Sequence, residues 1–230
     1  GGPWQLAGKL DNGAVRGTAT SAAGEVAFAA RFDGDRLLVR IGELETPFCR
    51  TIPVDAKLAD LGAPVADPAR QWTLAVYLGG DNDLENAAID DLMEMVRGLP
   101  EHGVEVVVLL DRAEHEGQGQ GIWSDTRVLH LRRGAEDPIE TLATPGELDT
   151  GFARTLAGFL SGAFRKYPSP HRAVVIWNHN GGWTGVVQDQ NAPGVDGGSD
   201  MLNLTDVRLA LQTAQVRCNM LQRFDLVAFD

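Results

Sequence analysis

The pattern of apolar and polar residues divides the chain into two parts. In residues 26–41 apolar and polar positions alternate, which is the period of half-buried β-strands. From Trp72 onward, near-continuous apolar runs are separated by segments with apolar residues at helical spacing. Such runs are typical of parallel strands covered by helices on both faces. The sequence therefore predicts two regions of different architecture.

The first region is predicted to be an antiparallel β meander. Turn signals at Asn12-Gly13, Ala23-Gly24 and Asp33-Gly34 separate its apolar runs, so we expect four strands in a β-rich module over residues 1–48. Residues 49–71 contain several prolines among small and polar residues. That composition predicts a linker.

The second region, residues 72–230, is predicted to be an α/β domain. Strands alternating with helices imply right-handed crossovers and a largely parallel sheet with helices on both faces. A glycine- and aspartate-rich stretch at 184–203 is predicted to be a long loop. The expected strands cover residues 73–78, 104–110, 127–131, 174–177 and 226–229, and the expected helices run through residues 84–96, 152–167 and 207–214.

Composition excludes several classes of protein. The net charge of −12 over 230 residues argues against nucleic-acid binding, and no apolar run is long enough to cross a membrane. Two distant cysteines, Cys49 and Cys218, fit neither a zinc site nor a disulfide framework, which leaves both a secreted or cell-envelope and a cytoplasmic location open. Gly79-Gly80 lacks the further residues of a dinucleotide-binding or P-loop motif.

The strongest candidate for chemistry is His179. It follows the apolar run Val174–Trp177 directly and precedes Asn180-Gly181-Gly182. Functional residues of open α/β sheets lie beyond the carboxyl ends of the strands, and an imidazole held there can transfer protons. The alternative is an ordinary histidine in a loop after a strand.

Three segments resemble the clostripain family of bacterial cysteine peptidases, relatives of caspases, gingipains and legumain. They are Trp-Thr-Leu-Ala-Val-Tyr-Leu-Gly-Gly-Asp-Asn-Asp-Leu-Glu at 72–85, Tyr-Pro-Ser-Pro with Val-Val-Ile-Trp-Asn-His-Asn-Gly-Gly-Trp within 167–183, and Phe-Asp-Leu-Val-Ala-Phe-Asp at 224–230. The resemblance covers residues 72–230 and implies a caspase-like fold. It also implies a His–Cys dyad that cleaves peptide bonds after arginine or lysine.

The resemblance implies roles for individual residues. His179 would be the catalytic histidine, and the backbone N–H groups of Asn180 and Gly181 would form part of the oxyanion hole, although the family generally has glycine where Asn180 stands. Asp230 would lie in the pocket for the basic substrate side chain. Asp81 and Asn82 are candidates for extending that pocket. They and Asp83 are alternatively turn and helix-capping residues, or one of the three orients His179.

The family pattern places the nucleophilic cysteine two residues beyond Asp230. We therefore expect a second chain or a C-terminal fragment to carry it, and the chain end reflects either processing or truncation.

No cofactor or metal is required, although the acidic run at 81–85 and the resemblance leave calcium open. The expected partner is a polypeptide with a basic residue before the scissile bond. The alternative function is an inactive caspase-like scaffold that mediates protein interactions.

Overall fold

The computed structural model of the chain describes residues 5–11, 14–21, 24–33, 36–41, 44–49, 51–113, 123–195, 200–218 and 223–230. The chain forms two compact units, Gly1–Thr51 and Ile52–Asp230, which we describe separately. No described helix is long and apolar enough to cross a membrane.

The first unit is an antiparallel sheet with strands in the order β1-β2-β3-β4-β5. Its small core contains Ala19, Phe28, Ala30 and Val39. The strands are β1 (Gln5–Asp11), β2 (Ala14–Ser21), β3 (Gly24–Asp33), β4 (Arg36–Ile41) and β5 (Leu44–Cys49).

The predicted meander was therefore one strand short. Strand β5 contains Pro47, a residue that cannot donate a hydrogen bond to a neighbouring strand. Because β5 is an edge strand, a residue without an N–H group is tolerated on its open side. Pro47 lies opposite Leu38 of β4.

The second unit is built on a six-stranded sheet in the order β13-β10-β6-β7-β8-β9. Strands β13, β10, β6 and β7 are parallel, and β8 and β9 are antiparallel additions. The prediction of a largely parallel sheet is confirmed. The strands are β6 (Trp72–Gly80), β7 (Val104–Arg112), β8 (Thr126–Leu131), β9 (Ile139–Gly146), β10 (His171–Trp177) and β13 (Leu226–Phe229).

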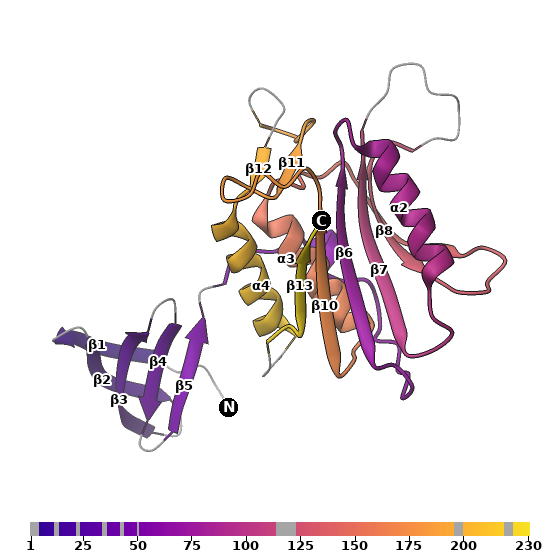
Figure 1. Cartoon of the computed structure of the whole chain (residues 1–230). Helices are drawn as coiled ribbons and strands as arrows, with labels where there is room; N and C mark the ends of the chain where they lie inside the picture. The colour runs from indigo at the N-terminus through magenta and orange to yellow at the C-terminus, as the bar shows by residue number, and fades with distance from the viewer. Residues whose placement is uncertain are drawn as a thin grey trace. The chain divides into compact units, whose positions relative to one another are not determined.

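Helices cover both faces of this sheet, as predicted. Figure 1 shows α3 and α4 on one face and α2 on the other. On the α3 side, Phe159 and Leu160 pack with Tyr77, Val107 and Ile176 in one core cluster. On the α2 side, Ala88 and Leu92 pack in a second cluster with residues of β6 and β7. The helices are α1 (Ala56–Ala59), α2 (Glu85–Gly98), α3 (Ala153–Lys166) and α4 (Leu204–Arg217).

Sequence patterns missed three strands of this unit. Strand β9 lies at the sheet edge with a register irregularity against β8, and much of its length is only partly buried, so it has no clear apolar period. The segment 184–203, predicted to be a loop, contains β11 (Val187–Asp189) and β12 (Asp200–Leu202), which pair antiparallel. Strands of three residues are too short to show a periodic pattern.

Most of the predicted linker belongs to the second unit. Helix α1 lies within it, and Leu58 is fully buried against α3. A Cβ atom on Gly162 of α3 would lie 2.0 Å from the carbonyl oxygen of Leu58, and one on Gly158 would lie 2.8 Å from that of Asp55. The two glycines therefore let the backbone of 55–58 approach α3 closely.

We expect Gly162→Ala to destabilise the second unit, since the added methyl group would push α1 away from α3. The expected loss is about 1–3 kcal/mol of unfolding free energy, the usual cost of overpacking. Gly98→Ala is the matched control, because a Cβ there meets nothing within 4 Å and this glycine ends α2. Denaturant unfolding of both variants tests the prediction, and equal midpoints would refute it.

Candidate active site

The site is organised by Asn178, the first residue after β10. Its side chain is 5% exposed. Its Nδ2 donates to the carbonyl oxygens of Gly79 (2.8 Å) and Gln188 (3.0 Å). Its Oδ1 accepts from the backbone N–H groups of His179 (2.6 Å) and Gln188 (3.1 Å). One amide therefore joins the ends of β10 and β6 to β11 and fixes where the chain turns into His179.

Asn178 was not among the site residues predicted from the sequence. The available signal was a polar residue directly after a buried strand and directly before the candidate histidine. Gly79 is the complementary feature, because a Cβ atom there would lie 2.9 Å from Nδ2 of Asn178 and 2.8 Å from the Val187 side chain. Only glycine allows this close approach without displacement.

His179 bonds to Asp83, and both side chains are accessible. Nε2 of His179 lies 2.6 Å from Oδ1 of Asp83, and the two side chains are 39% and 75% exposed. The hydrogen bond from His179 lowers the pKa of Asp83. Because an ionised carboxylate only accepts, Nε2 carries the proton and Nδ1 is the basic nitrogen of neutral His179. Within the described part of the chain, Nδ1 has no hydrogen-bond partner.

Of the run Asp81-Asn82-Asp83, only Asp83 reaches the histidine. Asn82 is 4% exposed; it donates to Gln188 and accepts from the N–H of Leu84 (2.9 Å). Asp81 is 1% exposed and accepts from Nδ2 of Asn191 (3.1 Å). Both side chains are therefore buried and hydrogen-bonded within the protein, and their contact with substrate stays a prediction. Asp83 is also not the cap of α2, since the residue before its first turn is Leu84.

The turn after His179 has a constrained backbone. Asn180 has a φ of +48° and Gly182 one of +67°, both in the left-handed region. Nδ2 of Asn180 donates to the carbonyl oxygens of Asn178 (3.0 Å) and Asp230. The carbonyl oxygen of Gly181 accepts from Oγ1 of Thr184 (2.7 Å). No described residue accepts from the N–H of Asn180 or Gly181.

Asp230 follows β13 and lies beside this turn. Its carbonyl oxygen accepts from the N–H of Asn178 (3.1 Å). Its side chain lines a groove of about 320 Å³ whose wall includes Asp91 and Glu94 of α2 and whose floor includes Val76 and Trp177. The structure thus brings Asp230 to the histidine turn, and two further carboxylates line the same groove.

A second hollow lies on the other side of the same turn. It has a volume of about 300 Å³ and is lined by Asn180, Gly182, Val186, Leu204 and Phe229. Its lining is mostly apolar. The two hollows differ in charge, because three carboxylates line the first and none lines the second.

Three carboxylates are buried together at this edge of the sheet. Oxygens of Asp81, Asp111 and Asp189 all lie within 4.8 Å of one another, and the three residues are 1%, 0% and 0% exposed. Burial and then the charge of Glu147 raise the pKa of Asp111 well above its usual range. Burial and then the charges of Asp200 and Asp189 raise the pKa of Asp149 to about 7. This acidic cluster is where a metal ion could be held.

Cys218 lies away from this site. Cys218 follows α4, and its Sγ donates to the carbonyl oxygen of Ser161 (3.6 Å). Burial raises the pKa of Cys218 to about 11, so its thiol stays protonated near neutral pH. Cys49 belongs to the first unit, and its side chain lies outside the described part of the structure.

Comparisons with known proteins agree with this geometry. The clostripain family profile matches residues 76–230. The chain is similar to a secreted C11 cysteine protease from Bacteroides thetaiotaomicron in complex with an irreversible peptide inhibitor, with 26% identity and a TM-score of 0.54. That match covers 70% of this chain and 42% of the other, so the chain spans less than half the length of this relative.

A weaker similarity links the chain to an inactive zymogen C11 protease from Parabacteroides distasonis, with 18% identity and a TM-score of 0.41 over 52% of this chain and 34% of that one. No curated protein matches the sequence. The family profile covers more than half of the chain, and the largely parallel sheet with helices on both faces is the caspase-like fold expected from the resemblance. The chain therefore belongs to the clostripain family of cysteine peptidases.

Proposed function

We propose that this chain supplies the histidine of a His–Cys dyad in a cysteine endopeptidase that cleaves after basic residues. The observation that carries the proposal is the 2.6 Å bond between His179 and Asp83 at the carboxyl end of the sheet. This bond holds an accessible imidazole in one orientation with Nδ1 as the base. A second chain or a C-terminal fragment of the protein would carry the cysteine.

The proposed reaction is acyl transfer through a thioester. Nδ1 of His179 takes the proton of the cysteine thiol, and the thiolate sulfur bonds to the scissile carbonyl carbon. The imidazolium then protonates the leaving amine, which breaks the C–N bond, and water later hydrolyses the thioester. A free cysteine has a pKa near 8.5 and is only a few per cent thiolate at neutral pH, so the reaction needs this base. The Asp83 carboxylate stabilises the imidazolium.

The oxyanion of the tetrahedral intermediate would bind to the backbone N–H groups of Asn180 and Gly181. Two observations support this role: neither N–H has an acceptor among the described residues, and the positive φ of Asn180 turns the backbone sharply after His179. The side-chain bonds of Asn180 hold the turn in place before substrate binds. Preorganised donors of this kind are effective because they need no rearrangement during the reaction.

The acidic groove supports the proposed preference for basic residues. Asp230, Asp91 and Glu94 line the same groove, and its other lining residues are apolar. A guanidinium or ammonium group would pair with a carboxylate there, while its aliphatic stem would lie on the apolar floor. Asp230 is the proposed principal partner because it lies next to the turn that holds His179.

We expect His179→Ala, measured in the full-length protein, to lower kcat/KM for an arginyl amide substrate by about 10²–10⁴-fold, the usual contribution of a general acid–base. Asp83→Asn should lower kcat/KM by roughly 10- to 100-fold. This effect is smaller than at a buried triad aspartate, because the pair is exposed.

The matched control is Asp225→Asn. Asp225 forms another accessible carboxylate–histidine pair, with His171 at 3.1 Å, at the opposite end of β10. This variant should keep activity within about twofold, since surface pairs contribute little. Full activity in His179→Ala would exclude the dyad, and a protein that cleaves nothing even when complete would favour the inactive scaffold.

We expect Asp230→Asn to change the preference for basic substrates more than the rate of bond cleavage itself. The kcat/KM for arginyl amide should fall roughly 10- to 100-fold, as expected for loss of a charge-assisted pair. The value for the neutral isostere citrulline should change little. Asp91→Asn is the comparison variant, because it removes a carboxylate from the same groove but from α2. An unchanged arginine-to-citrulline ratio in Asp230→Asn, or a preference for aspartyl substrates, would overturn the assignment.

A further inference from the structure

We propose that the apolar hollow beside the histidine turn binds the side chain of the substrate residue directly after the scissile bond, and that it selects a large apolar side chain there. The hollow has a volume of about 300 Å³ and is lined by Asn180, Gly182, Val186, Leu204 and Phe229. The inference rests on the proposed peptidase function and adds a second determinant of its specificity.

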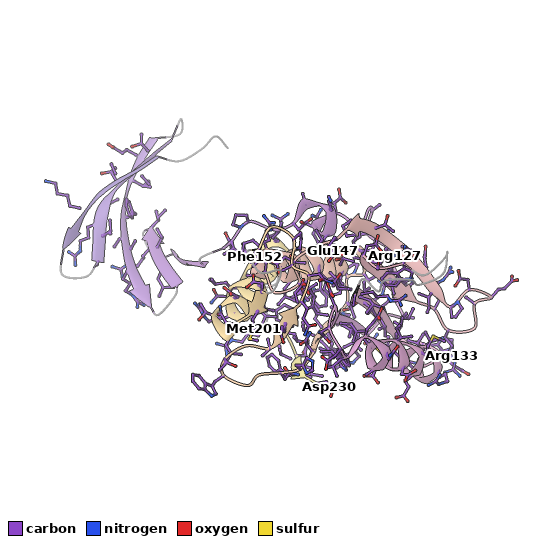
Figure 2. The ribbon with its side chains drawn as sticks, turned by 90° about the horizontal axis from the view of Figure 1, so that it is seen from above. Arg127, Arg133, Glu147, Phe152, Met201 and Asp230 are labelled. Carbon is purple, nitrogen blue, oxygen red and sulfur yellow. The ribbon has the colours of Figure 1, made fainter. Side chains whose placement is uncertain are left out.

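The hollow and the acidic groove open on opposite faces of the sheet. Successive side chains of a strand point to opposite faces. Phe229, at the end of β13, lines the apolar hollow, and the next residue, Asp230, lines the acidic groove. Ile176, the partner of Phe229 in β10, belongs to the core on the side of α3 and α4, whereas Trp177 belongs to the core on the α2 side. In Figure 2, Met201 of β12 accordingly lies to the left of Asp230, and Figure 1 shows α2 to the right of the chain end.

An extended peptide across this edge would place neighbouring side chains in the two hollows. Because side chains alternate along an extended chain, a basic residue in the acidic groove turns the side chain of the next residue to the opposite side. In the proposed mechanism His179 protonates the leaving amine, so the residue that carries this amine lies next to His179. Asn180 and Gly182, one and three residues beyond His179, line the apolar hollow. The hollow therefore lies on the leaving-group side of the scissile bond.

The residues around the hollow expose apolar surface that a substrate side chain would cover. Leu204 is 45% exposed and Phe229 48%, and Trp183, which directly follows Gly182, is 86% exposed. Large apolar residues that are exposed together are typical of binding sites. Within the described part of the chain, no charged residue lines the hollow. An apolar side chain therefore fits it better than a charged one, which would lose its hydration without gaining a partner.

The floor and one wall of the hollow are in place before a substrate binds. Val186 is 4% exposed, belongs to the α3-side core and donates its N–H to the carbonyl oxygen of Leu202 (2.9 Å). The side chain of Asn203 caps α4 by accepting from the N–H of Thr205 (2.9 Å), which fixes the first turn of the helix and Leu204 with it. Preorganised surfaces bind more tightly because little ordering is needed on binding.

Peptides of one sequence, with arginine before the scissile bond and leucine, phenylalanine, serine or aspartate after it, test the proposal in the full-length protein. We expect kcat/KM to be about tenfold or more higher for leucine and phenylalanine than for serine and aspartate, which is the range in which apolar pockets discriminate between side chains. The arginyl amide substrate has no amino-acid residue after the bond. It reports whether the enzyme is active independently of the hollow.

Leu204→Glu places a carboxylate at the hollow, and an acidic residue in the first turn of a helix is favourable for the helix. The leucine-to-serine ratio of kcat/KM should fall about fivefold or more, and lysine after the bond should gain relative to leucine. Ratios within one variant cancel any change in its overall activity. Val216→Glu is the matched control, because Val216 lies on the same helix with a similar exposure of 47% and does not line the hollow. It should keep the ratios of the parent.

Separate outcomes distinguish this inference from the proposed function. Equal kcat/KM for all four peptides in an enzyme that cleaves the arginyl amide, or an unchanged leucine-to-serine ratio in Leu204→Glu, would overturn the inference and leave the peptidase function intact. A complete protein that cleaves no arginyl substrate would overturn both. Denaturant unfolding of the two Glu variants tests for another occupant. A lower midpoint in Leu204→Glu alone, with an unchanged ratio, would show that another segment of the protein fills the hollow, which also overturns the inference.

Discussion

The in-register parallel pairing of β10 with β6 is the constraint on which the site depends. His171 lies opposite Trp72 and Trp177 opposite Leu78, so both strands reach the same edge of the sheet within two residues of each other. Asn178 then bonds to Gly79, and His179 lies within reach of Asp83. A slip of one residue would turn Asn178 and every apolar residue of β10 to the wrong face. The buried faces of β10, which pack on α3 and on the α2 side, exclude that slip.

The three residues of the turn after β6 lie in two different environments, one buried and one exposed to solvent. Asp81 points into the buried cluster with Asp111 and Asp189, Asn82 bonds to backbone groups, and Asp83 faces outward to His179. The interior carboxylates are costly to bury, whereas the exposed pair contributes little to stability. Asp81 and Asp83 are thus only two peptide bonds apart, one in the buried cluster and the other at the proposed catalytic histidine.

The role of a residue at the site was easier to predict from its position directly after a strand than from a run of polar residues. His179 could be predicted because a buried strand must end where its apolar run ends, and the next residues then lie at the sheet edge. The run Asp81-Asn82-Asp83 gave three candidates of equal standing. Their roles depend on the path of the backbone through the turn, which residue types alone do not specify. Burial separates them, at 1% and 4% exposure for the first two and 75% for the Asp83 side chain.

The sequence by itself determined the main strands and helices of the second unit, the largely parallel sheet and the place of His179, because these follow from the local periods of apolar residues. It did not determine the fifth strand of the first unit or the packing of residues 55–58 on α3, because edge strands and short helices carry little periodic signal. Only the tertiary structure decided which distant groups meet. Asn178 bonds to Gln188 of β11, and Asp81, Asp111 and Asp189 converge from three separate segments of the chain. Such contacts depend on how the sheet is assembled, and no local pattern encodes them.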